Sequence, residues 1–247
     1  MDVTPETLPA VALLSGLRSS LPTGATRRIV EILGRRIAGG SYAPGTVIPR
    51  EDELAQALGV SRTTVRDAIK VLSGKSLLRT ARRYGTRVQP VDDWNLLDPD
   101  VLAWHDPVHP RFRAIFSEAM ALRRMIEPEA AGLAALRASA GQSRAILEAA
   151  RGLAMTRGAV VQGLAADGRF HATVIAATGN LMLRQLSPTI VSMLRIAGEQ
   201  GASRVRFDPG QGAAHLAVAE AIRDGDACAA RARMRALAYP DLGGSDN

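Results

Sequence analysis

The apolar positions near the N-terminus repeat at helical spacing in three short runs. The first run predicts a helix over Thr26–Ala38 that stops at a Gly-Gly pair, and the second predicts a helix over Arg50–Leu58. Gly59 then breaks the chain, and Ser61 is a suitable N-cap for a third helix. The inward stripe of this third helix is Val65, Ile69 and Leu72. A short helix, a glycine-centred turn and a second helix with exposed polar residues at its start are typical of a helix-turn-helix.

The segments after the third helix predict a two-stranded wing and then a connector. Leu77–Thr80 and Thr86–Gln89 can pair as a hairpin around Arg82-Arg83-Tyr84-Gly85. Residues 91–110 are rich in aspartate and proline and hold both tryptophans, but they show no helical period. We therefore interpret them as a linker that contributes to no core.

The C-terminal half has the pattern of a helical bundle, because proline and glycine hardly interrupt its helical period. We expect about six helices, over Arg111–Ser139, Gln142–Met155, Val160–Thr178, Leu181–Glu199, Gly212–Arg223 and Asp226–Leu237, with a loop at Gly201–Gln211. The predicted fold class is mainly α, with an N-terminal winged helix-turn-helix and a C-terminal all-α bundle. The expected bounds are 1–23 for a flexible arm, 24–90 for the winged domain, 91–110 for the linker, 111–240 for the bundle and 241–247 for a flexible tail.

Composition and charge support this division. Only 4% of residues are aromatic against 47% that are apolar, so the core consists mainly of leucine, alanine, isoleucine and valine, which favours helices over sheets. Residues 24–90 hold 13 lysines and arginines against 5 acidic residues, whereas the remainder holds 18 against 19. The excess positive charge therefore lies in one segment, as expected of a single phosphate-contacting module. A uniformly basic protein with no such partner would carry the excess in both halves.

Cysteine usage and the N-terminal stretch bear on the compartment. The single cysteine, Cys228, excludes an intramolecular disulfide and suits a reducing cytoplasm, where we expect it to be a small core residue. Leu8–Leu17 is mildly apolar, but Pro9 and Gly16 interrupt it and no basic region precedes it. We expect neither a signal peptide nor a membrane span, and a cytoplasmic protein.

Two sets of motifs resemble a known family. The run from Ile48-Pro49-Arg50-Glu51 to Val65-Arg66-Asp67-Ala68 resembles the signature of the GntR family of bacterial regulators. The C-terminal half resembles the helical ligand-binding (FCD) domain of the fatty-acid-regulator branch of that family. This second resemblance rests on Leu122-Arg123, Ile126-Glu127-Pro128, Asp167-Gly168-Arg169-Phe170-His171, Gly179-Asn180, His215 and Ala221–Asp226. The segment Trp94–Trp104 is similar to the linker of sugar-acid regulators in this branch, the galactonate-operon repressors among them.

The start of the third helix holds the residues expected to read DNA. An arginine fork can donate two hydrogen bonds to guanine, and we expect Arg62 and Arg66 to do so rather than to be solvated surface charges. The resemblance adds further DNA contacts: Ser61, Thr63 and Thr64 to backbone or base edges, Tyr84 and Gly85 to the minor groove, and Arg50, Arg82 and Arg83 to phosphates. The sequence departs from the family at Asp52, where many relatives carry a DNA-contacting arginine.

The bundle carries a candidate metal and effector site. Asp167 and His171 lie on one apolar helical stripe, and His215 points inward on a later helix. One oxygen and two imidazoles could bind a divalent metal, zinc above all, and leave positions open for a ligand. A hydrogen-bonded core cluster is the alternative. In the family the site commonly has a third histidine, which would fall near Met193, so metal-assisted and metal-free effector binding both stay open.

Arg123 allows two interpretations. Glu127 follows it by one helical turn, so the two could form a structural ion pair. The resemblance instead implies a bidentate clamp for an effector carboxylate, a geometry that suits arginine. Arg169 and Asn180 are further candidates for effector contacts by resemblance.

The predicted function is DNA-binding transcription regulation by a homodimer, because a two-fold dimer would read a palindromic operator. We expect a repressor that is released by a small carboxylate such as a sugar acid, although activation stays open. The alternatives are a metal-dependent regulator that responds to another organic acid and a DNA-binding protein without an effector. We expect no enzyme, because the sequence holds no P-loop, nucleophile elbow or dinucleotide fingerprint.

Overall fold

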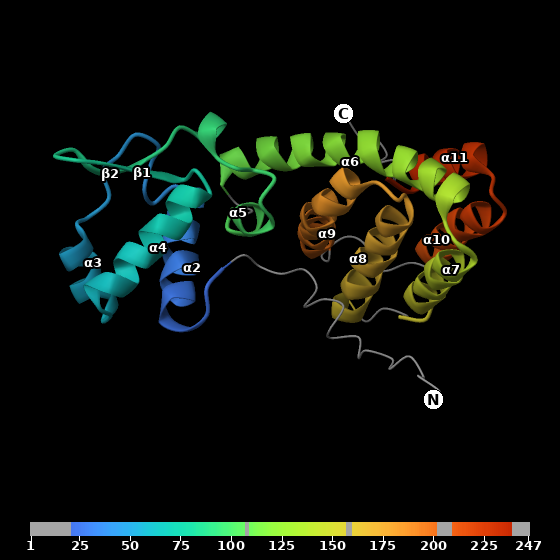
Figure 1. The fold of residues 1–247 in the computed structure, drawn as a ribbon, viewed down its shortest axis with the longest axis horizontal. Helices are drawn as coiled ribbons and strands as arrows, with labels where there is room; N and C mark the ends of the chain where they lie inside the picture. The colour runs from blue at the N-terminus through green and yellow to red at the C-terminus, as the bar shows by residue number, and fades with distance from the viewer. Residues whose placement is uncertain (1–20, 107–108, 157–159, 202–208, 239–247) are drawn as a thin grey trace, which may run out of the picture. The chain divides into compact units, whose positions relative to one another are not determined.

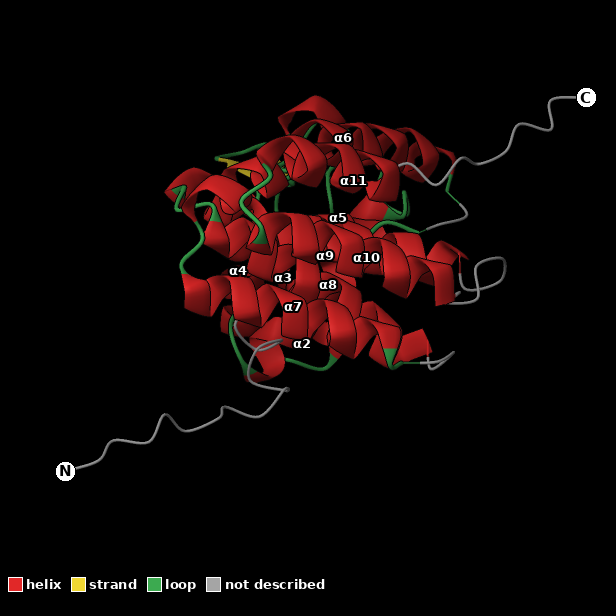
Figure 2. Ribbon diagram, turned by 90° about the vertical axis from the view of Figure 1, so that its right-hand side faces the viewer, coloured by secondary structure: helices red, strands yellow, loops and turns green. Residues whose placement is uncertain are grey.

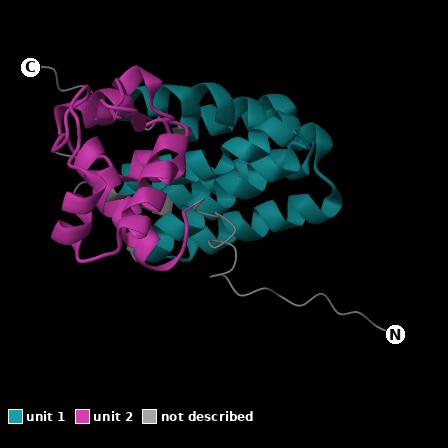
Figure 3. Ribbon diagram, turned by 60° about the vertical axis from the view of Figure 1, so that its left-hand side comes forward, with its two compact units in different colours: residues 1–18, 116–247 teal, residues 19–115 magenta. Residues whose placement is uncertain are grey.

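A computed structural model describes residues 21–106, 109–156, 160–201 and 209–238. The expected tail, and all but the last three residues of the expected arm, lie outside these ranges. The described chain forms two compact units, an N-terminal unit over Ser19–Ile115 and a C-terminal unit from Phe116 onward (Figure 3). Nearly all regular structure is helical, and a single small hairpin is the exception among the described residues (Figure 2). The expected mainly α fold class is confirmed.

The N-terminal unit is built on three helices (Figure 1), α2 Gly24–Ala38, α3 Glu51–Leu58 and α4 Arg62–Gly74. Leu33 and Leu72 are fully buried in the core between α2 and α4. Gly59 ends α3 with φ of 65°, a left-handed conformation that glycine adopts without strain. That tight turn lets α4 begin only four residues after the end of α3.

The wing is an antiparallel hairpin of β1 Leu78–Ala81 and β2 Gly85–Val88. Leu78 pairs with Val88, and both side chains are buried, whereas the positions toward the tip are mostly exposed. The free edge of β2 is covered near its middle, because Val47 forms a bridge with Arg87. The hairpin is therefore anchored to the core at its base and projects its tip into solvent.

The segment expected to be a linker belongs in part to the core of the N-terminal unit. It contains a short 3-10 helix over Val91–Asp93 and the helix α5 Pro99–Ala103. Trp94 and Trp104 are buried in the same core as α2 and α4, so the interpretation of a segment without a core role was wrong. The expected division at residues 90 and 110 remains a prediction.

A buried cation fixes this segment to the winged domain. Lys75, which is 4% exposed, donates from Nζ to Asp98 at 2.6 Å and to Asp100 at 2.9 Å. Its ammonium also lies 5.8 Å from the centre of the Trp104 ring. One lysine at the end of α4 thus bridges both aspartates at the start of α5.

The C-terminal unit is helical throughout its described residues. Its helices are α6 Pro110–Arg137, which begins in the N-terminal unit, α7 Ala140–Ala154, α8 Val160–Ala177, α9 Leu181–Gly201, α10 Pro209–Arg223 and α11 Ala227–Ala238. α8 packs against both α7 and α9, and α10 packs against α7 and α11. Phe170 on α8 is fully buried and joins a core that also includes Ile146 and Ile222.

Two further observations qualify the sequence expectations. No described helix combines the length and the apolar character that a membrane crossing requires. Cys228 is exposed, so the expectation of a small core residue was wrong. It lies in the first turn of α11, where the surface is open to solvent.

Candidate functional sites

The start of α4 presents the polar face expected to read DNA. Ser61 caps the helix, since its hydroxyl accepts a hydrogen bond from the Thr64 backbone at 3.1 Å. Arg62, Thr63 and Arg66 are exposed, whereas Thr64 is half-buried and its hydroxyl lies 2.8 Å from that of Ser61. The outward orientation of both arginines follows from the buried stripe on the opposite side of α4.

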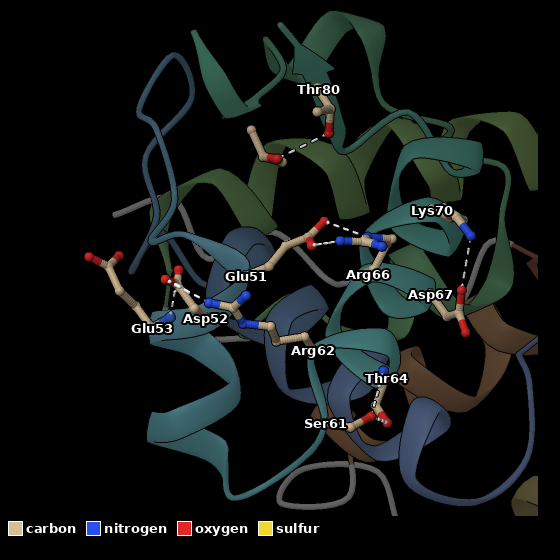
Figure 4. Close-up of polar contacts among 11 residues, drawn as sticks. Glu51, Asp52, Glu53, Ser61, Arg62, Thr64, Arg66, Asp67, Lys70 and Thr80 are labelled. Atoms are coloured by element: carbon tan, nitrogen blue, oxygen red, sulfur yellow. Dashed lines mark hydrogen bonds and ion pairs between the residues drawn. The ribbon is translucent and has the colours of Figure 1, made fainter. Parts of the chain in front are cut away.

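Both arginines meet carboxylates on α3 (Figure 4). Arg62 donates from Nη2 to Asp52 at 3.1 Å. Arg66 makes a two-pronged contact with Glu51, from Nε at 3.0 Å and from Nη2 at 2.8 Å. These acidic residues come from the first turn of α3, so the face that carries Arg62 and Arg66 also carries two negative charges.

The remaining DNA-contact candidates lie on exposed surface. Arg82, Arg83, Tyr84 and Gly85 are all exposed at or beside the tip of the wing, and Tyr84 is 74% exposed. Arg83 and Gly85 both have positive φ, 70° and 76°, which turns the backbone sharply at the tip. Arg50 is exposed at the start of α3. A side chain must be exposed to contact a macromolecule, and the DNA contacts of these residues stay predictions.

Asp167, His171 and His215 converge in the C-terminal unit. His215 Nε2 lies 2.9 Å from Asp167 Oδ1, and His171 Nε2 lies 3.6 Å from the same oxygen. One ligand atom from each residue can be chosen so that all three lie within 4.8 Å of one another. Both imidazoles are nearly fully buried and pack edge-on against Phe170. α8 and α10 thus bring together the three residues expected to form the metal and effector site.

Glu127 extends this cluster to Arg123. Arg123 donates from Nε and Nη2 to the two oxygens of Glu127, at 3.1 and 3.0 Å, so the local ion pair is present. Glu127 Oε1 also lies 3.3 Å from His171 Nδ1, an ion-pair distance without the alignment of a hydrogen bond. Glu127 is 1% exposed. A buried carboxylate therefore joins the arginine on α6 to the histidine on α8.

These contacts set the protonation of the cluster. Burial raises the pKa of Glu127, but the charges of His171 and Arg123 outweigh it and hold that pKa at about 2. Burial likewise raises the pKa of Asp167, and its histidine partners bring it well below the usual range. Burial lowers the pKa of His171, whereas Glu127 and Asp167 raise it to about 9. Without a metal, the cluster therefore holds an imidazolium between two carboxylates at neutral pH.

The donor set fits a divalent metal. His215 Nδ1 lies 2.7 Å from the Gln211 carbonyl, so a metal that took the place of the proton between His215 Nε2 and Asp167 would leave Nδ1 to donate to that carbonyl. Glu127 Oε1, 3.3 Å from His171 Nδ1, is close enough to support His171 by its charge. Ligands of a tetrahedral zinc are roughly 3.4 Å apart, so side-chain shifts of little more than 1 Å would close the site. Met193, near which the family resemblance places a third histidine, is buried and offers only a thioether. The protein supplies three good ligands.

Arg169 and Asn180 are not joined to the cluster by any hydrogen bond found among the described residues. The side-chain oxygen of Asn180 accepts from the backbone of Met182 and Leu183, at 2.9 and 3.2 Å, and so caps α9. The geometry supports a capping role for Asn180, and effector contacts by either residue stay predictions.

Sequence reasoning missed three residues that the structure places at the two sites. Glu127 was considered only as an ion-pair partner of Arg123, although a carboxylate one turn from an inward arginine can also face the core. From the sequence, Glu51 has no predicted role at this site, and Asp52 is identified only as a departure from the family. Their contacts with α4 span 15 and 10 residues, a separation for which a local pattern carries no signal.

Family models match a stretch of each of the two units. Residues 25–88 match the family model described as "Bacterial regulatory proteins, gntR family", and residues 118–238 match the FCD domain. The galactonate operon transcriptional repressor of Escherichia coli K12 is 34% identical over 177 residues, which are 71% of this chain and 76% of the repressor. The uncharacterized regulator YieP of the same organism is 40% identical over 114 residues, 46% of this chain and about half (49%) of YieP.

Solved structures share the fold at low identity. Lar of Listeria monocytogenes superposes with a TM-score of 0.60 at 14% identity, over 88% of this chain and 94% of Lar. McbR/YncC of E. coli gives a TM-score of 0.50 at 15% identity, over 88% of this chain and 95% of that protein. The two family models and the galactonate operon repressor, which is matched over 76% of its length, lead to one conclusion. This chain is a DNA-binding transcriptional regulator of the GntR family, with a C-terminal FCD domain.

Proposed function

We propose that the protein is a repressor that binds a palindromic operator as a homodimer and releases it when a sugar acid of the galactonate type binds the C-terminal unit. The observation that carries this proposal is the buried cluster of Asp167, His171 and His215, connected through Glu127 to Arg123. Burying ionisable groups on three helices costs folding free energy, and the same groups can bind a polar ligand. The similarity to a galactonate operon repressor gives the ligand class.

Arg123 can form the ion pair with Glu127 and bind an effector carboxylate at the same time. Glu127 occupies the side of the guanidinium formed by Nε and Nη2. The end formed by Nη1 and Nη2 retains donors for the two oxygens of an effector carboxylate. Among the described residues, Nη1 donates only to the sulfur of Met120, at 3.6 Å. The ion pair would then orient the guanidinium, and the other end would bind the acid.

A metal held by Asp167, His171 and His215 would supply a Lewis acid for a ligand carboxylate or hydroxyl. Because the protein offers three good ligands, at least one position would stay open for the effector. The chain's own residues do the rest: Glu127 and Gln211 orient the two imidazoles, and Arg123 binds the carboxylate. The same cluster without a metal would bind the acid through His171 in its charged form and Arg123.

The mechanism we propose is linkage between the two sites. One recognition helix covers too few base pairs for useful specificity, so two copies would read two half-sites. An effector that binds more tightly to a dimer arrangement whose recognition helices do not match the half-sites lowers operator affinity. The largest reduction equals the ratio of the effector's binding constants for that arrangement and for the operator-bound arrangement.

A thermal-shift assay tests the binding proposal. Galactonate at 100 times its dissociation constant should stabilise the protein by about 2.7 kcal/mol, whereas galactose, which lacks the carboxylate, should give a much smaller shift. Runs with zinc and with a chelator separate metal-assisted from metal-free binding. Asp167→Asn should remove the galactonate shift, and Glu148→Gln, an exposed change in the same unit, should keep it. No shift with any sugar acid would contradict the proposal.

A further inference from the structure

The two arginines expected to read bases are already occupied in the free protein. Asp52 holds Arg62 and Glu51 holds Arg66, as Figure 4 shows. All four side chains are substantially solvent-exposed, from 34% for Glu51 to 67% for Arg62. These pairs therefore lie on open surface, where DNA would arrive.

Two acidic side chains on this surface need an explanation beyond the stability of α3. Acidic residues in a first helical turn do complement the helix dipole. Glu53 in the same turn follows that logic and caps the helix by accepting from the Arg50 backbone at 2.8 Å. Glu51 and Asp52 reach across to α4 instead. A carboxylate that faces a polyanion weakens binding to every sequence, so the arrangement has a consequence for DNA binding.

An ion pair and a guanine contact hold an arginine with different strengths. An exposed ion pair changes an equilibrium by about 5-fold at most. A bidentate contact with guanine discriminates against other bases by about 5- to 150-fold. The guanine edge can therefore take an arginine from its carboxylate, whereas a poorer acceptor or a loosely placed phosphate gains little by doing so.

We propose that Glu51 and Asp52 are autoinhibitory residues that compete with DNA for Arg66 and Arg62 and hold operator affinity below its maximum. On a wrong sequence each arginine keeps its carboxylate and adds little affinity. On the operator the guanine edges displace the carboxylates, and each guanine contact is reduced by the free energy of the ion pair that it breaks. The proposal rests on the proposed base-reading role of these arginines, and it makes the acidic residues of α3 set how tightly the operator is bound.

Asp52→Asn and Glu51→Gln test this competition with almost no change in shape. The full-length protein would be titrated against a duplex that the wild type selects from a random library and against a scrambled duplex of the same composition, at one fixed salt concentration. Each variant should bind the selected duplex about 3- to 5-fold more tightly, because no ion pair has to break, and the scrambled duplex less than about 2-fold more tightly. The ratio of selected to scrambled affinity therefore rises.

Asp67→Asn is the matched control. Asp67 lies on the same helix, and its partner is Lys70, at 3.0 Å, rather than a reading arginine. This variant loses the same charge, so it should raise both affinities by the same factor and leave their ratio unchanged. In an Arg62→Ala background, Asp52→Asn should raise binding to the selected duplex no more than Asp67→Asn does, because the arginine that Asp52 competes for is gone.

Three outcomes overturn the proposal. Equal gains on both duplexes would make Asp52 and Glu51 general repulsive charges. Loss of affinity for the selected duplex alone would make them base contacts. A wild type that prefers no duplex would refute the base reading itself, and the competition with it. The wild-type titration alone shows this outcome, so it is distinguished from a failure of the competition.

Discussion

Removing the proton from His171 should destabilise the metal-free C-terminal unit. His171 is buried between Glu127 and Asp167, with its nitrogens 3.3 and 3.6 Å from their oxygens. Its pKa is raised from 6.5 to about 9 in the folded protein. A raised pKa stabilises the folded state fully below pH 6.5, and this stabilisation is lost as the pH rises through 9.

The size of the effect follows from these pKa values. The difference between 6.5 and about 9 corresponds to about 3 kcal/mol of folding free energy when His171 is fully protonated. Linkage places most of the loss, about 2 kcal/mol, between pH 7 and pH 9. The acidic side is different, because the depressed pKa of Glu127 gives stability above pH 4.5 that is lost as the pH falls toward 2.

Urea denaturation in the presence of a chelator measures this loss, and the molecule provides its own control. Both tryptophans, Trp94 and Trp104, lie in the N-terminal unit, so their fluorescence follows that unit alone. Helical circular dichroism follows both units. The loss between pH 7 and pH 9 should appear in the dichroism transition of the C-terminal unit and not in the fluorescence transition.

The variant His171→Gln removes the titrating group. It should be less stable than the wild type at pH 7 and should show no loss between pH 7 and pH 9 that depends on this residue. A wild-type C-terminal unit equally stable at both pH values, or the same loss retained in His171→Gln, would refute the reasoning.

Three other substitutions test the packing. Lys75→Met leaves two half-buried aspartates without their shared cation and should lower the unfolding free energy of the N-terminal unit by about 3 kcal/mol, measured by tryptophan fluorescence; an unchanged midpoint would argue against the buried pair. Asn180→Ala should lower the stability of the C-terminal unit by about 1 kcal/mol, because it removes the cap of α9, and should leave galactonate affinity unchanged; weaker galactonate binding would instead support an effector contact. Gly34→Ala should destabilise the N-terminal unit by about 1–3 kcal/mol in urea titrations, because its new methyl group would lie 2.5 Å from the Trp104 ring.

The sequence predicts the parts of the fold that depend on local repetition. The apolar spacing within Val65, Ile69 and Leu72 and the turn at Gly59 are local signals, and α4 lies where they indicate. The core role of Trp104 was missed, because it depends on contact with Gly34, seventy residues earlier, and no periodicity records such a contact.

In the candidate sites, too, local patterns predict some of the contacts and the tertiary structure defines the others. Asp167 and His171 share a helical stripe, so their convergence is local, and the addition of His215 depended on its own inward stripe. The bridging position of Glu127 depends on how α6 packs beside α8, which only the tertiary structure defines. The pairing of Arg62 with Asp52 depends likewise on the crossing of two helices.

Release of the operator by a sugar acid is the central claim, and fluorescence anisotropy of a labelled operator duplex tests it most directly. The duplex is the one selected by the wild type from a random library, and galactonate is titrated into the complex at fixed salt. Operator affinity should fall about 10-fold or more, with no fall in the Asp167→Asn variant. Operator affinity that stays unchanged at saturating galactonate, measured with and without zinc, would contradict the account.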